Sequence, residues 1–116
     1  MAHREYSRAD RIAAELRREV ALLVHDTVRD GGLPSVSVSD VEVTRDHAHA
    51  NVFVTALMPD KAQEAVKALN LAAKEFRWRL SRTLKLRSVP ELHFKYDDSV
   101  DRGERIEKLL RDAPDS

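Results

Sequence analysis

Residues 36–57, VSVSDVEVTRDHAHANVFVTAL, decide the fold of this chain. Apolar and polar residues alternate on either side of a polar turn at 45–47, which predicts two antiparallel strands joined as a hairpin. The valines before residue 39 occupy one parity of the first strand and those after residue 40 occupy the other. One extra residue re-aims the side chains that follow it, so this shift predicts a β-bulge near residues 39–40.

Helical patterns flank the hairpin on both sides. Ser7 is predicted to cap a first helix and Gly31-Gly32 to end it. After the hairpin, Asp60 is predicted to cap a helical pattern that runs through residue 86 without glycine or proline. The apolar stripe of this segment breaks near Asn70, which predicts a helix pair with a kink near residues 70–74. The stripe of the first helix consists of Ile12, Ala13, Leu16, Val20, Leu23 and Val24.

A third strand and a short last helix complete the predicted order. Ser88-Val89-Pro90 breaks the helix, and alternation over residues 92–96 predicts a strand. Asp97-Asp98-Ser99 is predicted to cap a last helix that contains Ile106. The order predicts an α+β fold in which helices cover one face of a three-stranded sheet. A chain of 116 residues is expected to form one domain, with its core in residues 5–111 and a flexible tail at 112–116.

The composition narrows the class of protein. Twenty basic residues balance twenty acidic ones, and 42% of the residues are hydrophobic, which is typical of a folded domain. The sequence has no cysteine, which excludes disulfides and thiolate metal sites. No apolar run approaches the roughly 20 residues that span a bilayer. We therefore expect a cytoplasmic protein without a membrane segment.

Positive charge is concentrated in residues 71–96, which hold seven basic and two acidic residues. On a helical wheel, four of these basic residues share an arc of about 140° with Ser81 and the single tryptophan, and this arc excludes the apolar stripe. Lysine and arginine would neutralise phosphates there, and an exposed indole would stack on an unpaired base. The alternative is a solvated helix face whose tryptophan lies on arginine stems through a cation–π contact. The arc holds Lys74, Arg77, Trp78, Ser81, Arg82 and Lys85.

No pattern of residues predicts catalysis or a metal site. Asp46, His47 and His49 cluster in the hairpin turn, but no further ligand follows at a familiar spacing, so an exposed turn is the better interpretation. Single histidines such as His93 are expected to be structural. The sequence has no glycine-rich phosphate loop and no serine in a recognisable pattern with histidine. We expect no cofactor, no bound metal, no small-molecule substrate and no enzymatic activity.

Several segments resemble the ribosome-binding factor A family, in order and at family spacing from about Arg4 to Leu110. The segments are Arg8-Ala-Asp-Arg-Ile12, Val41-Glu-Val-Thr-Arg-Asp46, Ala50-Asn-Val-Phe-Val-Thr55, Leu84-Lys-Leu-Arg-Ser-Val-Pro-Glu-Leu92 and Phe94-Lys-Tyr-Asp-Asp-Ser99. The resemblance implies a type II KH-like domain, a class that binds single-stranded RNA. Lys74 stands where the family has a glycine at the helix kink, and Asp30-Gly31-Gly32-Leu33 replaces an Asp-Pro-Arg-Leu sequence.

The resemblance also implies a function and a site. It implies a monomeric, non-catalytic factor that binds the free small (30S) ribosomal subunit and its 16S rRNA precursor. Such a factor assists late maturation, including processing of the rRNA 5′ end, and is associated with growth in the cold. Two rival functions are a protein-interaction module that holds a partner protein with the helix face or with Phe53, if Phe53 is exposed, and an RNA-processing enzyme. The predicted RNA-binding residues are Lys74, Arg77, Trp78, Ser81, Arg82, Lys85 and Arg87, with Arg45 in the hairpin turn.

Overall fold

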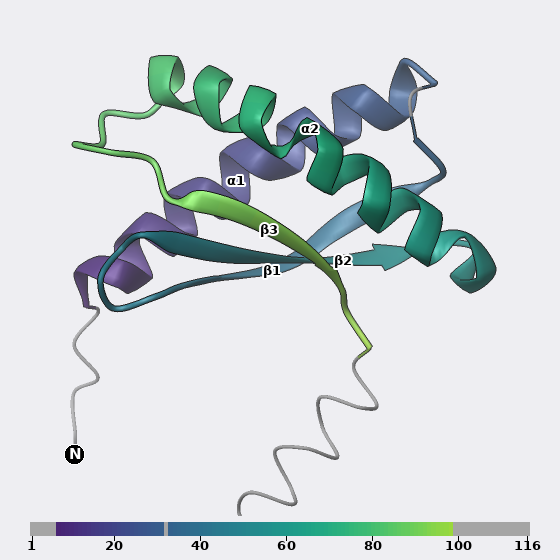
Figure 1. Ribbon diagram of the computed structural model, residues 1–116, viewed down its shortest axis with the longest axis horizontal. Helices are drawn as coiled ribbons and strands as arrows, with labels where there is room; N and C mark the ends of the chain where they lie inside the picture. Colours follow the sequence, from purple (N-terminus) through teal and green to yellow (C-terminus); the bar gives the residue numbers. More distant parts are fainter. Residues whose placement is uncertain (1–6, 32, 99–116) are drawn as a thin grey trace, which may run out of the picture.

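Two helices cover one face of a three-stranded sheet in the computed structural model, which describes residues 7–31 and 33–98 (Figure 1). This arrangement confirms the predicted α+β class. The predicted last helix and the predicted 112–116 tail lie outside the described residues. The elements are α1 (Arg8–Arg29), β1 (Val36–Val43), β2 (His49–Ala56), the 3₁₀ turn η1 (Pro59–Lys61), α2 (Ala62–Thr83) and β3 (Glu91–Tyr96).

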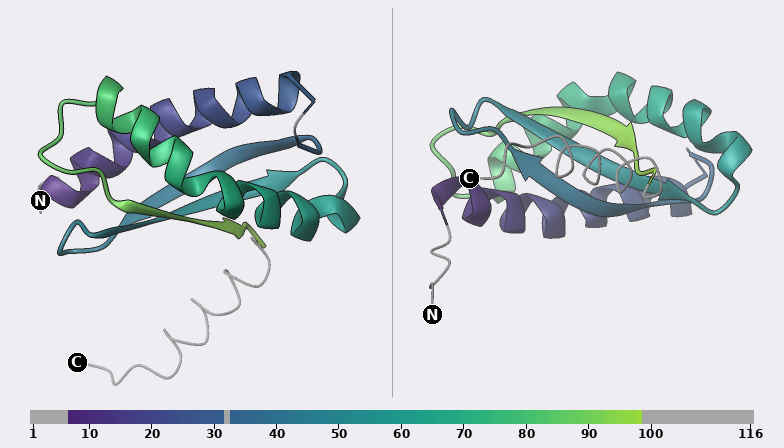
Figure 2. Two further views of the ribbon diagram at one scale, coloured as in Figure 1. Left: turned by 45° about the horizontal axis from the view of Figure 1, so that its top comes forward. Right: turned by 90° about the horizontal axis from the view of Figure 1, so that it is seen from below.

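The sheet has the order β1-β2-β3, with β1 antiparallel and β3 parallel to β2. Both helices lie on the same side of it: seen from below, the three strands lie in front of α1 and α2 (Figure 2, right). The pairing of β1 with β2 shifts register at Ser39, between Val38 and Asp40, and so confirms the predicted bulge. The Ser39 hydroxyl donates to the carboxylate of Asp97 over 2.6 Å. The bulge therefore ties β1 to the residue that follows β3.

The ends of α1 follow the expected local chemistry. The Ser7 hydroxyl accepts a hydrogen bond from the backbone N–H of Asp10, and the Asp10 carboxylate accepts one from the N–H of Ser7. At the other end Gly31 adopts a φ of 83°, a conformation that glycine reaches without a side-chain clash. These contacts confirm the predicted start and end of the helix.

The second half of the chain corrects the predictions about α2. The expected pair of helices is wrong, because residues 62–83 form one uninterrupted helix, which ends three residues before the predicted residue 86. Seven of its nine buried or half-buried residues lie within an arc of about 100°, so a single stripe reaches the core along the whole helix. Asp60 does not cap it either, since Pro59 starts the turn η1 and Asp60 lies inside that turn. The stripe consists of Ala62, Ala65, Leu69, Ala72, Ala73, Phe76 and Leu80.

Asn70, which interrupts the apolar pattern of the sequence, binds the edge of the sheet. Its side-chain N–H donates to the Phe94 carbonyl over 3.0 Å, and its side-chain oxygen accepts from the Phe94 N–H over 2.8 Å. β3 is an edge strand, so these main-chain groups face away from β2. The amide of Asn70 thus supplies the pair of hydrogen bonds that a further strand would make.

Replacement of Asn70 by alanine should lower the free energy of unfolding by about 1–3 kcal/mol, because it leaves two part-buried main-chain groups of Phe94 without this partner. Urea denaturation followed by circular dichroism measures the change. The matched control is Leu71→Ala on the neighbouring, 80% exposed side chain, for which we expect less than about 0.5 kcal/mol. Equal effects of the two substitutions would mean that the amide does not stabilise the edge of β3.

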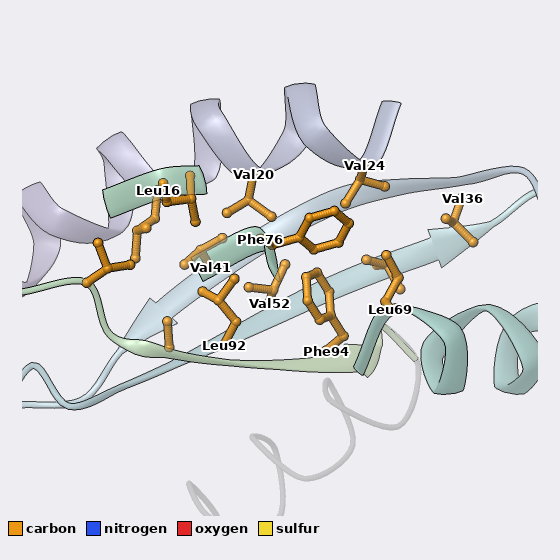
Figure 3. Close-up of a cluster of buried hydrophobic side chains, with 14 of the residues drawn as sticks. Leu16, Val20, Val24, Val36, Val41, Val52, Leu69, Phe76, Leu92 and Phe94 are labelled. Atoms are coloured by element: carbon orange, nitrogen blue, oxygen red, sulfur yellow. The ribbon is translucent and has the colours of Figure 1, made fainter. Parts of the chain in front are cut away.

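The core fills the space between the helices and the sheet (Figure 3). The rings of Phe76 and Phe94 meet edge to face, with centroids 6.0 Å apart, and join α2 to β3. Among residues 7–31 and 33–98, no polar or charged residue is fully buried. None of the helices described is long and apolar enough to cross a membrane.

Candidate nucleic-acid interface

A groove runs along the side of α2 that borders β3. Its larger part is a hollow of about 590 Å³ lined by Asn70, Ala73, Lys74, Arg77 and residues 91–95 of β3. A second hollow of about 380 Å³ continues it along Lys74, Arg77, Trp78, Ser81 and Val89. Because Lys74 and Arg77 line both hollows, we treat them as one surface, the α2–β3 groove. Figure 2 (left) shows how α2 lies across β3 at this edge of the sheet.

Two of the predicted site residues also support the local structure of the groove. Arg77 donates from Nε to the carbonyl of Val89 over 2.9 Å and so holds the segment between α2 and β3 against the helix. Ser81 donates its hydroxyl to the Trp78 carbonyl, one turn back in α2. Arg77 uses one of the five N–H groups of its guanidinium in this way, which leaves the charge at the groove.

Trp78 is the exposed aromatic side chain of the groove. It is 60% exposed, as the helical wheel predicts. The guanidinium carbon of Arg82 lies 5.0 Å from the centroid of the indole ring, so the cation–π contact of the alternative interpretation is present. The ring keeps its exposure with Arg82 on one face, and an indole has a second face on which a base can stack. The two interpretations of this helix face are therefore compatible.

The remaining predicted residues lie around the groove and do not line it. Lys85 and Arg87 are exposed in the segment that follows α2. Arg45 is exposed in the β1–β2 turn, at the end of the sheet where Glu91 donates its N–H to the Ala48 carbonyl. The structure thus brings four of the eight residues together in the groove and adds Arg82 through its stacking on Trp78.

Four polar or charged residues of the groove were not among those predicted from the sequence. Asn70, His93 and Lys95 line it, and so does the acidic Glu91. Lys95 belongs to the positive segment, which was the available signal. Its position beside α2 depends on β3 being the edge strand next to that helix. No local pattern of residues predicts this strand order.

The β1–β2 turn is organised by Asp46. Its carboxylate accepts from the Thr44 hydroxyl over 2.6 Å and from the Ala48 N–H over 3.0 Å. These hydrogen bonds, that of Thr44 first, hold the pKa of Asp46 below its usual value. His47 in the same turn has a φ of 61°. The predicted polar turn therefore accounts for Asp46 and His47.

His49 and His93 lie together, which no pattern in the sequence predicts. His49 Nδ1 and His93 Nε2 are 3.0 Å apart, and the Glu91 carboxylate lies 3.9 Å from His49 Nδ1. The sequence predicts His49 to be part of the hairpin turn and His93 to be a single structural residue. The parallel pairing of β2 with β3 brings them to one side of the sheet.

Phe53 points away from the helices, as its parity predicts. Its side chain is half-buried, so it is less exposed than an anchor for a partner protein would be. Its register partners are Asp40 of β1 and Lys95 of β3. The protein-interaction hypothesis thus has less exposed apolar surface at this position than expected.

The element order α-β-β-α-β and the mixed sheet β1-β2-β3 define an α+β domain in which one helix stands where the predicted order has a kinked pair. The family model for ribosome-binding factor A matches residues 8–110. The chain belongs to the ribosome-binding factor A family, as the resemblance of its motifs implied.

Individual proteins agree with this assignment. Ribosome-binding factor A of Stenotrophomonas maltophilia (strain K279a) is 62% identical over 111 residues, which cover 96% of this chain and 87% of that protein. The crystal structure of ribosome-binding factor A from Thermus thermophilus shares the fold, with a TM-score of 0.67 at 24% identity over 78% of this chain and 97% of that one. A homology model of the Thermus thermophilus factor, fitted into a cryo-EM map of a 30S complex, has a TM-score of 0.61 at 26% identity over 72% and 88% of the two chains.

Proposed function

We propose that this protein binds the small ribosomal subunit and contacts its 16S RNA through the α2–β3 groove. The family and the Thermus thermophilus factor fitted into a 30S complex map support the subunit as the partner. The observation that carries the site is the groove itself, where Lys74 and Arg77 lie beside an exposed Trp78 in a chain with no net charge. A polyanion responds to this local field and not to the sum over the chain.

The groove offers the contacts that unpaired RNA uses. Lys74, Arg77 and Lys95 supply positive charge for phosphates, and Trp78 supplies a stacking surface. Strand alternation turns the main-chain N–H and C=O of Leu92 to the same edge of β3 as those of Phe94. Leu92 lines the groove, so its main chain can form hydrogen bonds with base edges there. Such contacts favour an unpaired stretch of RNA over a regular duplex.

The same binding supports a role in assembly without catalysis. The groove presents lysine, arginine, amide and indole groups, which bind and position RNA. A monomer bound to unpaired 16S RNA would hold one conformation of it during late maturation, so that 5′-end processing by other enzymes can follow. Growth at low temperature would depend on the factor most, because misfolded RNA structures persist longer there. The site of action would be the cytoplasm, where the subunits assemble.

Fluorescence of Trp78 tests this placement directly, since it is the only tryptophan in the chain. Titration with a single-stranded RNA oligonucleotide should change the indole emission, because a base would replace solvent at a ring that is 60% exposed. The change should weaken in Lys74→Glu and persist in Arg79→Glu, a charge on the same helix that does not line the groove. Binding seen by anisotropy of labelled RNA without any change at Trp78 would exclude the groove as the site.

A further inference from the structure

We propose that His49, Glu91 and His93 form a binding site for a divalent transition-metal ion such as Zn²⁺. One ligand atom from each of the three side chains lies within 4.8 Å of the other two. The two imidazole nitrogens, Nδ1 of His49 and Nε2 of His93, are 3.0 Å apart. Two histidines and one carboxylate form a ligand set that zinc uses in proteins.

The sheet itself holds the three side chains in place. His49 is the direct register partner of Glu91 in the parallel β2–β3 pair. His93 follows Glu91 by two residues, so both side chains project from the same face of β3. The ligands therefore stand on two paired strands and not on loops, which limits how far they can separate.

The distances suit a tetrahedral ion after small side-chain rotations. Zinc–nitrogen bonds of roughly 2.0–2.1 Å place two ligand atoms of a tetrahedron about 3.3 Å apart. The His49–His93 separation of 3.0 Å is slightly shorter than this, and the His49–Glu91 separation of 3.9 Å is slightly longer. The side chains of His49 and Glu91 are 48% and 59% exposed, so an ion can reach them and they can rotate.

The donor atoms decide the kind of ion. Imidazole nitrogen favours zinc and its neighbours among the transition metals, whereas Mg²⁺ and Ca²⁺ require mainly oxygen ligands. Three protein ligands leave the fourth position of a tetrahedron for water or for a group of another molecule. A bound ion would also join the beginning of β2 to the beginning of β3. Because only the folded chain brings the three ligands together, the metal should raise the unfolding temperature.

The competing explanation is a hydrogen-bonded pair of imidazoles without a metal. At 3.0 Å one ring can donate its N–H to the other, with Glu91 as a nearby carboxylate. A metal ion would replace the shared proton and take the lone pairs of both nitrogens. The two explanations differ in a measurable way, since only the metal site predicts saturable zinc binding that depends on all three side chains.

Calorimetric titration of the full chain with ZnCl₂ tests the proposal, in a His3→Gln background that removes a histidine outside the described residues. We expect one equivalent of zinc to bind and the unfolding temperature to rise. His93→Gln and, separately, Glu91→Gln should each weaken binding by at least about tenfold, as the loss of a ligand requires. Both side chains are at least partly exposed, and unfolding of each variant without metal serves as the control for its fold.

Two further histidines provide matched controls. His25→Gln, on the exposed face of α1, should bind zinc as the background chain does. His47→Gln should also leave binding unchanged, although His47 is closer to His49 in sequence than either proposed partner. Absence of zinc binding in the background chain would overturn the proposal. So would binding that survives both His93→Gln and Glu91→Gln, because the ion would then be adventitious.

Discussion

Replacement of Leu80 by alanine should lower the free energy of unfolding by about 2–5 kcal/mol. Leu80 is 1% exposed and belongs to the face of α2 that packs on the core, where truncation leaves a cavity that the neighbouring side chains fill only partly. Domains of this size are stable by roughly 5–15 kcal/mol, so the loss is a large share of the total. Urea denaturation followed by circular dichroism measures it.

Leu57→Ala is the matched control for Leu80→Ala, because the Leu57 side chain is 81% exposed and loses little burial. We expect a change of less than about 0.5 kcal/mol for this control. A Leu80→Ala protein as stable as the Leu57→Ala protein would contradict the packing of α2 against the sheet.

Exchange of both Lys74 and Arg82 for glutamate should weaken binding to the small ribosomal subunit roughly 100-fold at low salt. Two charge-assisted contacts of about 1.5 kcal/mol each correspond to a factor of that size. Lys74 lines both parts of the α2–β3 groove, and Arg82 stacks on Trp78. Co-sedimentation with purified subunits measures the affinity.

The choice of Lys74 over Arg77 follows from the structure. Reversal of Arg77 would also break its hydrogen bond to Val89, so weaker binding and a disturbed segment after α2 would be confounded. The matched control is Arg79→Glu, which changes an exposed charge on α2 outside the groove. Equal losses in this control and in the double variant would mean that only the total charge matters. Unchanged binding of the double variant would mean that the α2–β3 groove does not bind the subunit.

Features that depend on a short stretch of sequence were predicted correctly. The change of parity between Val38 and Val41 was enough to place the bulge, and Ser7 with Asp10 was enough to place the start of α1. Each of these depends on residues within a few positions of one another. Local hydrogen bonding and side-chain parity follow directly from such spacing.

The errors in α2 have a common cause. The sequence predicts two helices because Asn70 and Leu71 interrupt the apolar pattern. In the structure, Ala72 and Ala73 continue the buried stripe of a single helix. Asn70 is polar because it binds the edge of β3, a partner that lies 24 residues further along the chain. A polar residue used for a tertiary contact looks, in the sequence alone, like the end of a helix face.

The candidate sites also contain residues that local periodicity predicts and residues that only the whole fold brings together. Lys74, Trp78 and Arg82 share one helix face, so periodicity alone predicted that they would lie together. Lys95 entered the groove, and His93 met His49, only through the parallel pairing of β3 with β2. Strand order and register depend on the whole fold, and neither is encoded in the spacing of residues along one segment.

The salt dependence of binding to purified small subunits tests directly whether the α2–β3 groove binds RNA phosphates. If Lys74, Arg77 and Lys95 in the groove and Arg82 and Lys85 beside it each contact a phosphate, the logarithm of the binding constant should fall with the logarithm of the salt concentration at a slope of about −3.5 to −4.5. The slope should be less steep by about two in the Lys74→Glu, Arg82→Glu protein, which loses two of these contacts. Tight binding with a slope near zero would show that RNA phosphates do not carry the affinity and would point to a ribosomal protein as the partner.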